Sequence, residues 1–175
     1  MIVMLAARVA QLVFAAVVLA LSVVLIKGYG PGSAPALISY GAFCGGAAIV
    51  VAAVNVLALF LDKLQGIIML ALDGLASFFL VAGGIAFAVS IKTGDCKDQV
   101  YTFKHKSTFY PSFTKTYPTT SEKKAARMAR DDIVSRCRMV TAETAILWFT
   151  FACFLATVVL AFLTGRSGKR GGAIV

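Results

Sequence analysis

Few residues in this sequence could perform chemistry. The 175 residues include four cysteines and a single histidine, His105. Cys96 and Cys137 lie in polar sequence, whereas Cys44 and Cys153 lie inside apolar runs. A zinc site made from these residues would need ligands at very different depths, so we expect neither a metal nor a cofactor. Motifs for a nucleophilic serine, a phosphate-binding loop or a zinc protease are also missing from the sequence, which predicts a protein without catalytic residues.

Asp73 is the acidic residue in the most unusual setting, because it interrupts a long apolar run. In the centre of a membrane helix an ionised Asp costs about 2.5–3.5 kcal/mol on the insertion scale. We expect a polar packing contact with Asn55, Ser77 or a backbone group. The alternative is a proton or ion pathway, which we weight lower because no second buried charge is evident to pair with Asp73. Glu143, in contrast, is expected at a membrane boundary, neutralised by Arg138 or Lys92.

The composition indicates the environment in which the chain folds. Hydrophobic residues make up 59% of the chain and charged residues only 14%, with a mean hydropathy of +0.87. Soluble domains have about 45–50% apolar and about 25% charged residues. The net charge of +9 could suggest nucleic acid, but eleven of the 17 basic residues fall between Lys92 and Arg138. We therefore predict a membrane protein that does not bind nucleic acid.

Four apolar stretches are long enough to cross a bilayer. They cover residues 9–26, 36–61, 65–91 and 140–163. Even the shortest would be about 27 Å long as a helix, close to the hydrocarbon thickness of about 30 Å. A membrane β-barrel would instead show alternating apolar and polar residues, and these stretches do not. The sequence therefore predicts an all-α, integral membrane four-helix bundle in one domain, residues 1–165.

The connections between these stretches differ greatly. Residues 28–35 form a Gly/Pro turn, and the link after residue 61 is so short that the second and third helices must be antiparallel neighbours. Residues 92–139 form a long polar loop. Its first half is expected to be irregular or extended. Its second half is expected to be helical, either continuous with the fourth span or separate from it. We expect the loop aromatics, among them Phe103, Phe109 and Phe113, to pack over the end of the bundle, with contact with lipid headgroups as the next alternative. A disordered basic tail is expected at 166–175.

Small residues indicate where helices approach closely. Gly41 and Gly45 form a G-x-x-x-G pair, Gly46 follows Ala42 at the same spacing, and the third stretch contains Gly83 and Gly84. Such residues allow helix backbones to pack tightly, within the bundle or between copies in a homo-oligomer. Contacts with lipid headgroups are expected for aromatic residues near the span ends and for the basic tail. These residues are Trp148, Tyr40, Arg166, Lys169 and Arg170.

The third and fourth stretches carry a family resemblance. The segment LALDGLASFFLVAGGIAFAV is followed by Cys96, and SRCRM precedes AETAILWFTFACFLATVVLAF. These motifs resemble fungal MARVEL-domain tetraspan proteins, in particular the non-classical export protein family. The resemblance implies a non-catalytic plasma-membrane organiser in eisosome compartments, linked to sphingolipid. The loop of this chain is longer than that family's pattern.

Cysteines and charges disagree about the orientation. If the third and fourth helices are antiparallel neighbours, Cys96 and Cys137 lie close together, either as a disulfide on an oxidising face or as two cytosolic thiols. Four spans place both termini on one side. That side carries five basic residues and the other carries twelve, so the positive-inside rule predicts a cytosolic loop. The disulfide reading and the resemblance favour an extracellular loop 92–139 with cytosolic termini, which is the orientation we expect.

Three functions remain open. The first is a membrane organiser that associates with lipids, of the sterol or sphingolipid class, and with copies of itself or other membrane proteins. The second is a small channel or transporter that uses Asp73, although the spans contain few other polar residues. The third is an accessory subunit of a larger membrane complex.

Overall fold

The computed structural model describes residues 2–29, 34–58, 67–92, 94–110 and 121–170, with the side chains of 2, 3 and 164–170 excepted. Every regular element in these ranges is a helix, which confirms the predicted all-α class. The helices are α1 (Ile2–Tyr29), α2 (Ala36–Ala58), α3 (Ile67–Ile91), α4 (Gln99–Lys104), α5 (Lys106–Phe109) and α6 (Glu122–Arg170).

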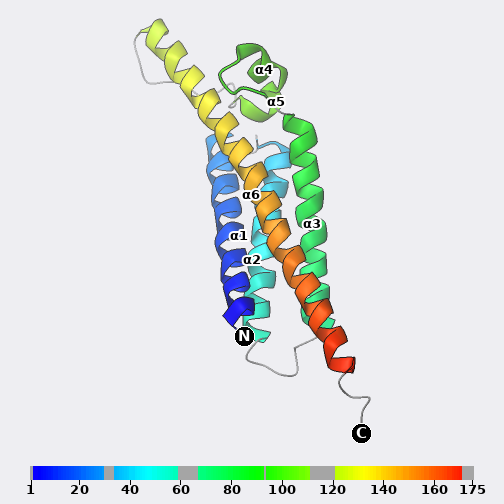
Figure 1. Ribbon diagram of the computed structural model, residues 1–175. Helices are drawn as coiled ribbons and strands as arrows, with labels where there is room; N and C mark the ends of the chain where they lie inside the picture. Colours follow the sequence, from blue (N-terminus) through cyan, green and yellow to red (C-terminus); the bar gives the residue numbers. More distant parts are fainter. Residues whose placement is uncertain (1, 30–33, 59–66, 93, 111–120, 171–175) are drawn as a thin grey trace.

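Four of these helices are long and apolar enough to span a membrane. The candidate spans are Met4–Tyr29, Ala36–Ala58, Ile67–Ile91 and a stretch within Glu122–Leu163. In Figure 1 the four helices run along one axis, α1 packs beside α2, and α6 crosses over α1 and α3. The start of α1 and the end of α6 lie at the lower end of this bundle, as expected for four spans.

Two helices extend further than the apolar runs predicted. The first begins at Ile2 rather than at residue 9. The last begins at Glu122, so the helix expected in the second half of the loop is continuous with the fourth span. Its 49 residues correspond to about 74 Å, more than twice the thickness of the hydrocarbon core. Its first turns therefore project beyond the other long helices (Figure 1).

The ends of the loop and of the chain differ from expectation. The first half of the loop contains the short helices α4 and α5 rather than extended chain. The tail expected to be disordered is helical as far as Arg170, because α6 continues through it; residues 171–175 lie outside the described part. The expected lipid contacts of Arg166, Lys169 and Arg170 concern side chains that are also outside it.

The inner face of α6 follows a seven-residue repeat. The positions 136, 143, 150 and 157 are polar and buried, and Val140, Leu147 and Phe154 are apolar and fully buried between them. This alternating three- and four-residue spacing keeps one helical face directed at its neighbours. The described part of the core is completed by residues of the other helices, among them Ala15, Val18, Leu80 and Phe87.

Glycines set the distances between helices. A Cβ on Gly45 would lie 2.7 Å from the backbone nitrogen of Leu19, so α1 and α2 are in close backbone contact there. A Cβ on Gly41 would overlap the Glu143 carboxylate. Gly83 faces Tyr40 and Cys44, and Gly84 faces the Trp148 ring; Gly46, in contrast, has no heavy atom within 4 Å of its would-be Cβ. Gly46 therefore makes no close contact within this bundle, and its packing against another copy stays a prediction.

The neighbouring glycines provide a matched pair of substitutions. We expect Gly45→Ala to destabilise the bundle by about 1–3 kcal/mol, because the new methyl group meets the Leu19 backbone and forces α1 away from α2. Gly46→Ala should be neutral or stabilising by up to about 1 kcal/mol, because alanine is the better helix former. Unfolding midpoints measured in the same bilayer would check this. Equal effects of the two substitutions would contradict the close crossing.

The loop forms a cap on the upper end of the bundle. A disulfide joins Cys96 to Cys137 of α6, so the expected pairing is supported by a cysteine pair at bonding distance. The Tyr101 hydroxyl donates to the carbonyls of Ile91 and Lys92, at 2.9 and 3.0 Å, where α3 ends. Burial raises the pKa of Tyr101, which keeps this donor protonated. Phe109 is fully buried, as packing of the loop aromatics predicts, whereas Phe103 is 62% exposed and does not follow that prediction. Phe113 lies outside the described residues.

Candidate functional site

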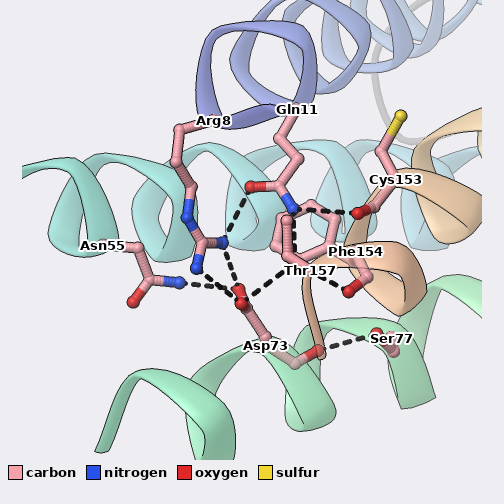
Figure 2. Close-up of polar contacts among 8 residues, drawn as sticks. All are labelled: Arg8, Gln11, Asn55, Asp73, Ser77, Cys153, Phe154 and Thr157. Atoms are coloured by element: carbon pink, nitrogen blue, oxygen red, sulfur yellow. Dashed lines mark hydrogen bonds and ion pairs between the residues drawn. The ribbon is translucent and has the colours of Figure 1, made fainter. Parts of the chain in front are cut away.

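An ion pair lies inside the bundle. The Arg8 guanidinium of α1 donates from Nη1 and Nη2 to the two carboxylate oxygens of Asp73 on α3, at 2.7 Å each. Both residues are only 1% exposed. This two-pronged geometry is the strongest arrangement of a guanidinium and a carboxylate. Figure 2 shows the pair between the two helices, with other polar side chains directed at it.

Neutral groups from the remaining long helices surround the carboxylate. Asn55 Nδ2 of α2 donates to Asp73 Oδ1 at 2.6 Å, and Thr157 Oγ1 of α6 lies 3.1 Å from Oδ2. Gln11 accepts from Arg8 at 2.9 Å and donates to Thr157 at 3.0 Å (Figure 2). We call Arg8, Gln11, Asn55, Asp73 and Thr157 the polar cluster. Its members come from all four long helices, so it fixes their relative positions.

The sequence predicted part of this cluster. Asp73 contacts Asn55 as expected, and the Ser77 hydroxyl donates to the Asp73 carbonyl at 2.7 Å. The expectation that no second buried charge pairs with Asp73 is wrong, because Arg8 does. Arg8 was expected outside the first span, but α1 begins at Ile2 and places it almost two turns inside the helix.

A signal for the missing partners was present in the sequence. The four long helices all carry polar residues within their apolar runs, such as Asn55 and Asp73. Arg8 and Gln11 also follow one another at i, i+3, which places them on one helical face. Thr157 belongs to the seven-residue polar repeat of α6.

Glu143 forms a second polar centre, nearer to the loop. We expected a boundary residue beside Arg138 or Lys92, but Glu143 is fully buried and its Oε1 accepts a hydrogen bond from the Ser22 hydroxyl of α1. Its Oε2 has no hydrogen-bond partner among the described residues. The absence of a side chain at Gly41 provides the space that this carboxyl group occupies.

Apolar side chains separate the two centres. On α1, Ala15 and Val18 lie between Gln11 and Ser22 and are fully buried. On α6, Leu147 and Phe154 occupy the corresponding interval. The one polar residue of that interval on the inner face of α6, Thr150, donates to its own helix at Ile146. An apolar layer therefore separates these two polar centres, and a third buried polar side chain, Arg136, lies beyond Glu143 and donates to the Gly28 carbonyl.

The described part of the loop holds its one histidine in a packing contact. His105 Nδ1 lies 2.9 Å from the Tyr101 carbonyl, and its ring packs against Tyr101 and Phe109. Within the described ranges, no group of three or more metal-binding side chains occurs. Cys44 and Cys153 are free thiols on separate spans.

The side chains expected at the membrane interface are partly used for packing. The Tyr40 hydroxyl donates to the Phe79 carbonyl at 3.3 Å. The Trp148 ring lies over Gly84 and against Phe151, and 39% of Trp148 remains exposed. A lipid contact for either residue is still a proposal.

This fold and its polar cluster define a class: a multi-pass helical membrane protein whose spans are held together by buried polar groups. The profile of the MARVEL family, described as a membrane-associating domain, matches residues 2–160. The chain therefore belongs to the MARVEL family. No curated protein matches the chain. No solved structure matches it either.

Proposed function

We propose that this protein is a non-catalytic organiser of the plasma membrane. It associates with lipids of a sphingolipid-linked or sterol class, and with copies of itself or other membrane proteins, in eisosome-type compartments. Its termini face the cytosol and residues 92–139 face outward. Support comes from membership of a membrane-associating family and from the motifs shared with the non-classical export proteins.

One observation carries this proposal: the bundle turns its polar side chains inward and large apolar side chains outward. The polar cluster is buried, whereas apolar residues on each long helix are exposed in the isolated chain. Apolar surface of this extent is a site for lipid or for other membrane helices. Examples are Val9, Val13, Phe43, Val50, Phe78, Ile85, Phe149 and Val159.

The same interior weighs against the channel. A conduction path through Asp73 needs a carboxylate free to exchange protons or ions, and Asp73 is held by Arg8 and two neutral donors. The apolar layer above the polar cluster also interrupts a polar route to Glu143. We therefore assign Asp73 a structural role in joining helices.

Imaging of the tagged protein in cells tests the organiser. We expect fluorescence concentrated in plasma-membrane patches that disperse when sphingolipid synthesis is inhibited, because recruitment depends on surrounding lipid. Gly45→Ala is a useful comparison, because it disturbs the α1–α2 crossing, and Gly46→Ala is its control. A uniform distribution that responds to neither sphingolipid nor sterol depletion would contradict the proposal.

Reconstitution tests the two alternatives. Liposomes containing the protein should pass protons no faster than protein-free liposomes. Proton flux that Asp73→Asn abolishes would favour the channel instead. Mild detergent extraction should release the chain without one partner at fixed stoichiometry; a constant ratio to a larger membrane protein would favour the accessory subunit.

A further inference from the structure

A groove lies outside the spans, between α4 and the projecting part of α6. Its volume is about 820 Å³. Val100 and Phe103 of α4 line one side, and Ala129 and Ile133 of α6 line the other. Pockets that hold small ligands usually have about 300–1,000 Å³. The groove is thus large enough for a ligand of that size.

The polar lining of the groove carries one sign of charge. Lys97, Arg127 and Arg130 line it, and among the described residues no carboxylate does. In the part of the chain that the structure describes, none of these three cations forms an ion pair. Arg127 and Arg130 are three residues apart on α6, so their guanidinium groups can approach one anion together.

The apolar lining is open to water. Val100 is 77% exposed and Phe103 is 62% exposed, although both belong to a helix that packs on the end of the bundle. They are also three residues apart and therefore share a face of α4. Large apolar side chains in a cationic groove match a ligand with an apolar part and an anionic head.

A second hollow adjoins this groove on the side nearer to the fourth span. It measures about 540 Å³ and shares Lys97, Arg130 and Val134 with the first. Its lining includes one carboxylate, Asp131, beside the cations, and continues along α6 to Arg138 and Met139, just before the residue at which the fourth span was predicted to begin. A ligand could therefore arrive from the headgroup layer, which favours an amphiphile over an acidic peptide from solution.

We propose that the groove binds a single-chain anionic amphiphile. Its carboxylate or phosphate accepts hydrogen bonds from Arg127, Arg130 and Lys97, and its chain packs on Val100 and Phe103. The site does not depend on the organiser function: a chain that forms no patches could still bind this ligand, and a chain that forms them could lack it.

Photocrosslinking in nanodiscs tests the site. The full chain is placed in uncharged phosphatidylcholine and exposed to a photoreactive lysophosphatidate, a photoreactive oleate, or a lysophosphatidylcholine with the same chain. We expect one or both anionic probes to label residues 97–103 and 126–134, and the zwitterionic probe to label only the spans. Whichever anionic probe binds identifies the headgroup. Equal labelling of the groove by all three probes would overturn the proposal.

Two matched pairs of variants locate the binding. Arg127→Gln with Arg130→Gln should weaken binding of the anionic probe about tenfold or more. Lys123→Gln with Lys124→Gln removes the same charge from exposed positions of the same helix that do not line the groove, and should change binding less than twofold. Ala129→Trp should block the groove, whereas Met128→Trp, on the neighbouring position, should not.

All four variants must keep the Cys96–Cys137 disulfide on a non-reducing gel, which verifies that the loop has folded. Equal losses within either pair would overturn the proposal, as would displacement by an acidic peptide without any binding of the amphiphiles.

Discussion

Replacing Asp73 with alanine should lower the free energy of unfolding by about 3–5 kcal/mol, because Arg8 then remains buried with its charge uncompensated. The loss should also release Asn55 and Thr157, which both contact the carboxylate. Asp131→Ala removes an exposed carboxylate from α6 and should change stability by less than about 0.5 kcal/mol. Denaturant unfolding in a common bilayer would compare the two.

Removing both charges should be much less harmful than removing either. The double variant Arg8→Met, Asp73→Leu replaces the pair with apolar side chains, and such replacements of buried ion pairs are often neutral or stabilising. We expect it to be more stable than Arg8→Met or Asp73→Leu alone. Losses that simply add would show that the two residues act independently and would contradict the pairing.

Local composition determines where the spans lie, whereas contacts between helices determine where the charged residues lie. The spans follow from apolar length, because a bilayer admits only segments that satisfy their own backbone hydrogen bonds. Apolar length is a local property that does not depend on neighbouring helices. It therefore predicted four helices, their antiparallel order and the position of the loop.

The buried charges are different, because the cost of burying Arg8 depends on a carboxylate 65 residues away. Taken alone, an arginine near the end of an apolar run is best placed in water, and this assumption shortened the first predicted helix. The same reasoning placed Glu143 at a boundary, since its contact with Ser22 joins helices that are distant in sequence.

The glycines show that a sequence motif alone does not locate a helix crossing. Gly45 and Gly46 belong to overlapping motifs of equal quality, but one helical step rotates the second by about 100°. Only the direction of α1 decides which glycine is at the crossing, and the sequence motif does not contain that direction. The polar repeat of α6, in contrast, does indicate which face of α6 is buried, because positions seven apart share a face.

The proposed orientation of the chain rests on the disulfide and can be measured directly. Burial of Arg8 leaves four basic residues, Lys63, Arg166, Lys169 and Arg170, to oppose the basic loop, so the charge rule favours a cytosolic loop even more strongly. A disulfide persists only in an oxidising compartment. We expect a membrane-impermeant thiol reagent to label Cys96 and Cys137 on intact cells only after reduction.

In that experiment Cys44→Ala with Cys153→Ala removes the thiols of the spans and leaves the loop cysteines as the only targets. Labelling before reduction, or only after permeabilisation, would contradict an extracellular disulfide.

Loss of this disulfide should have a large effect on the loop. The bond joins residues 41 positions apart, and closing a loop of that length is worth about 4 kcal/mol by the chain-entropy argument. Cys96→Ala with Cys137→Ala should therefore strongly speed amide hydrogen exchange in α4 and α5. The bundle around Arg8 and Asp73 should stay protected, because no member of the polar cluster touches the disulfide. Unchanged exchange in α4 and α5 would mean that contacts such as Tyr101 with Ile91 suffice to hold the cap.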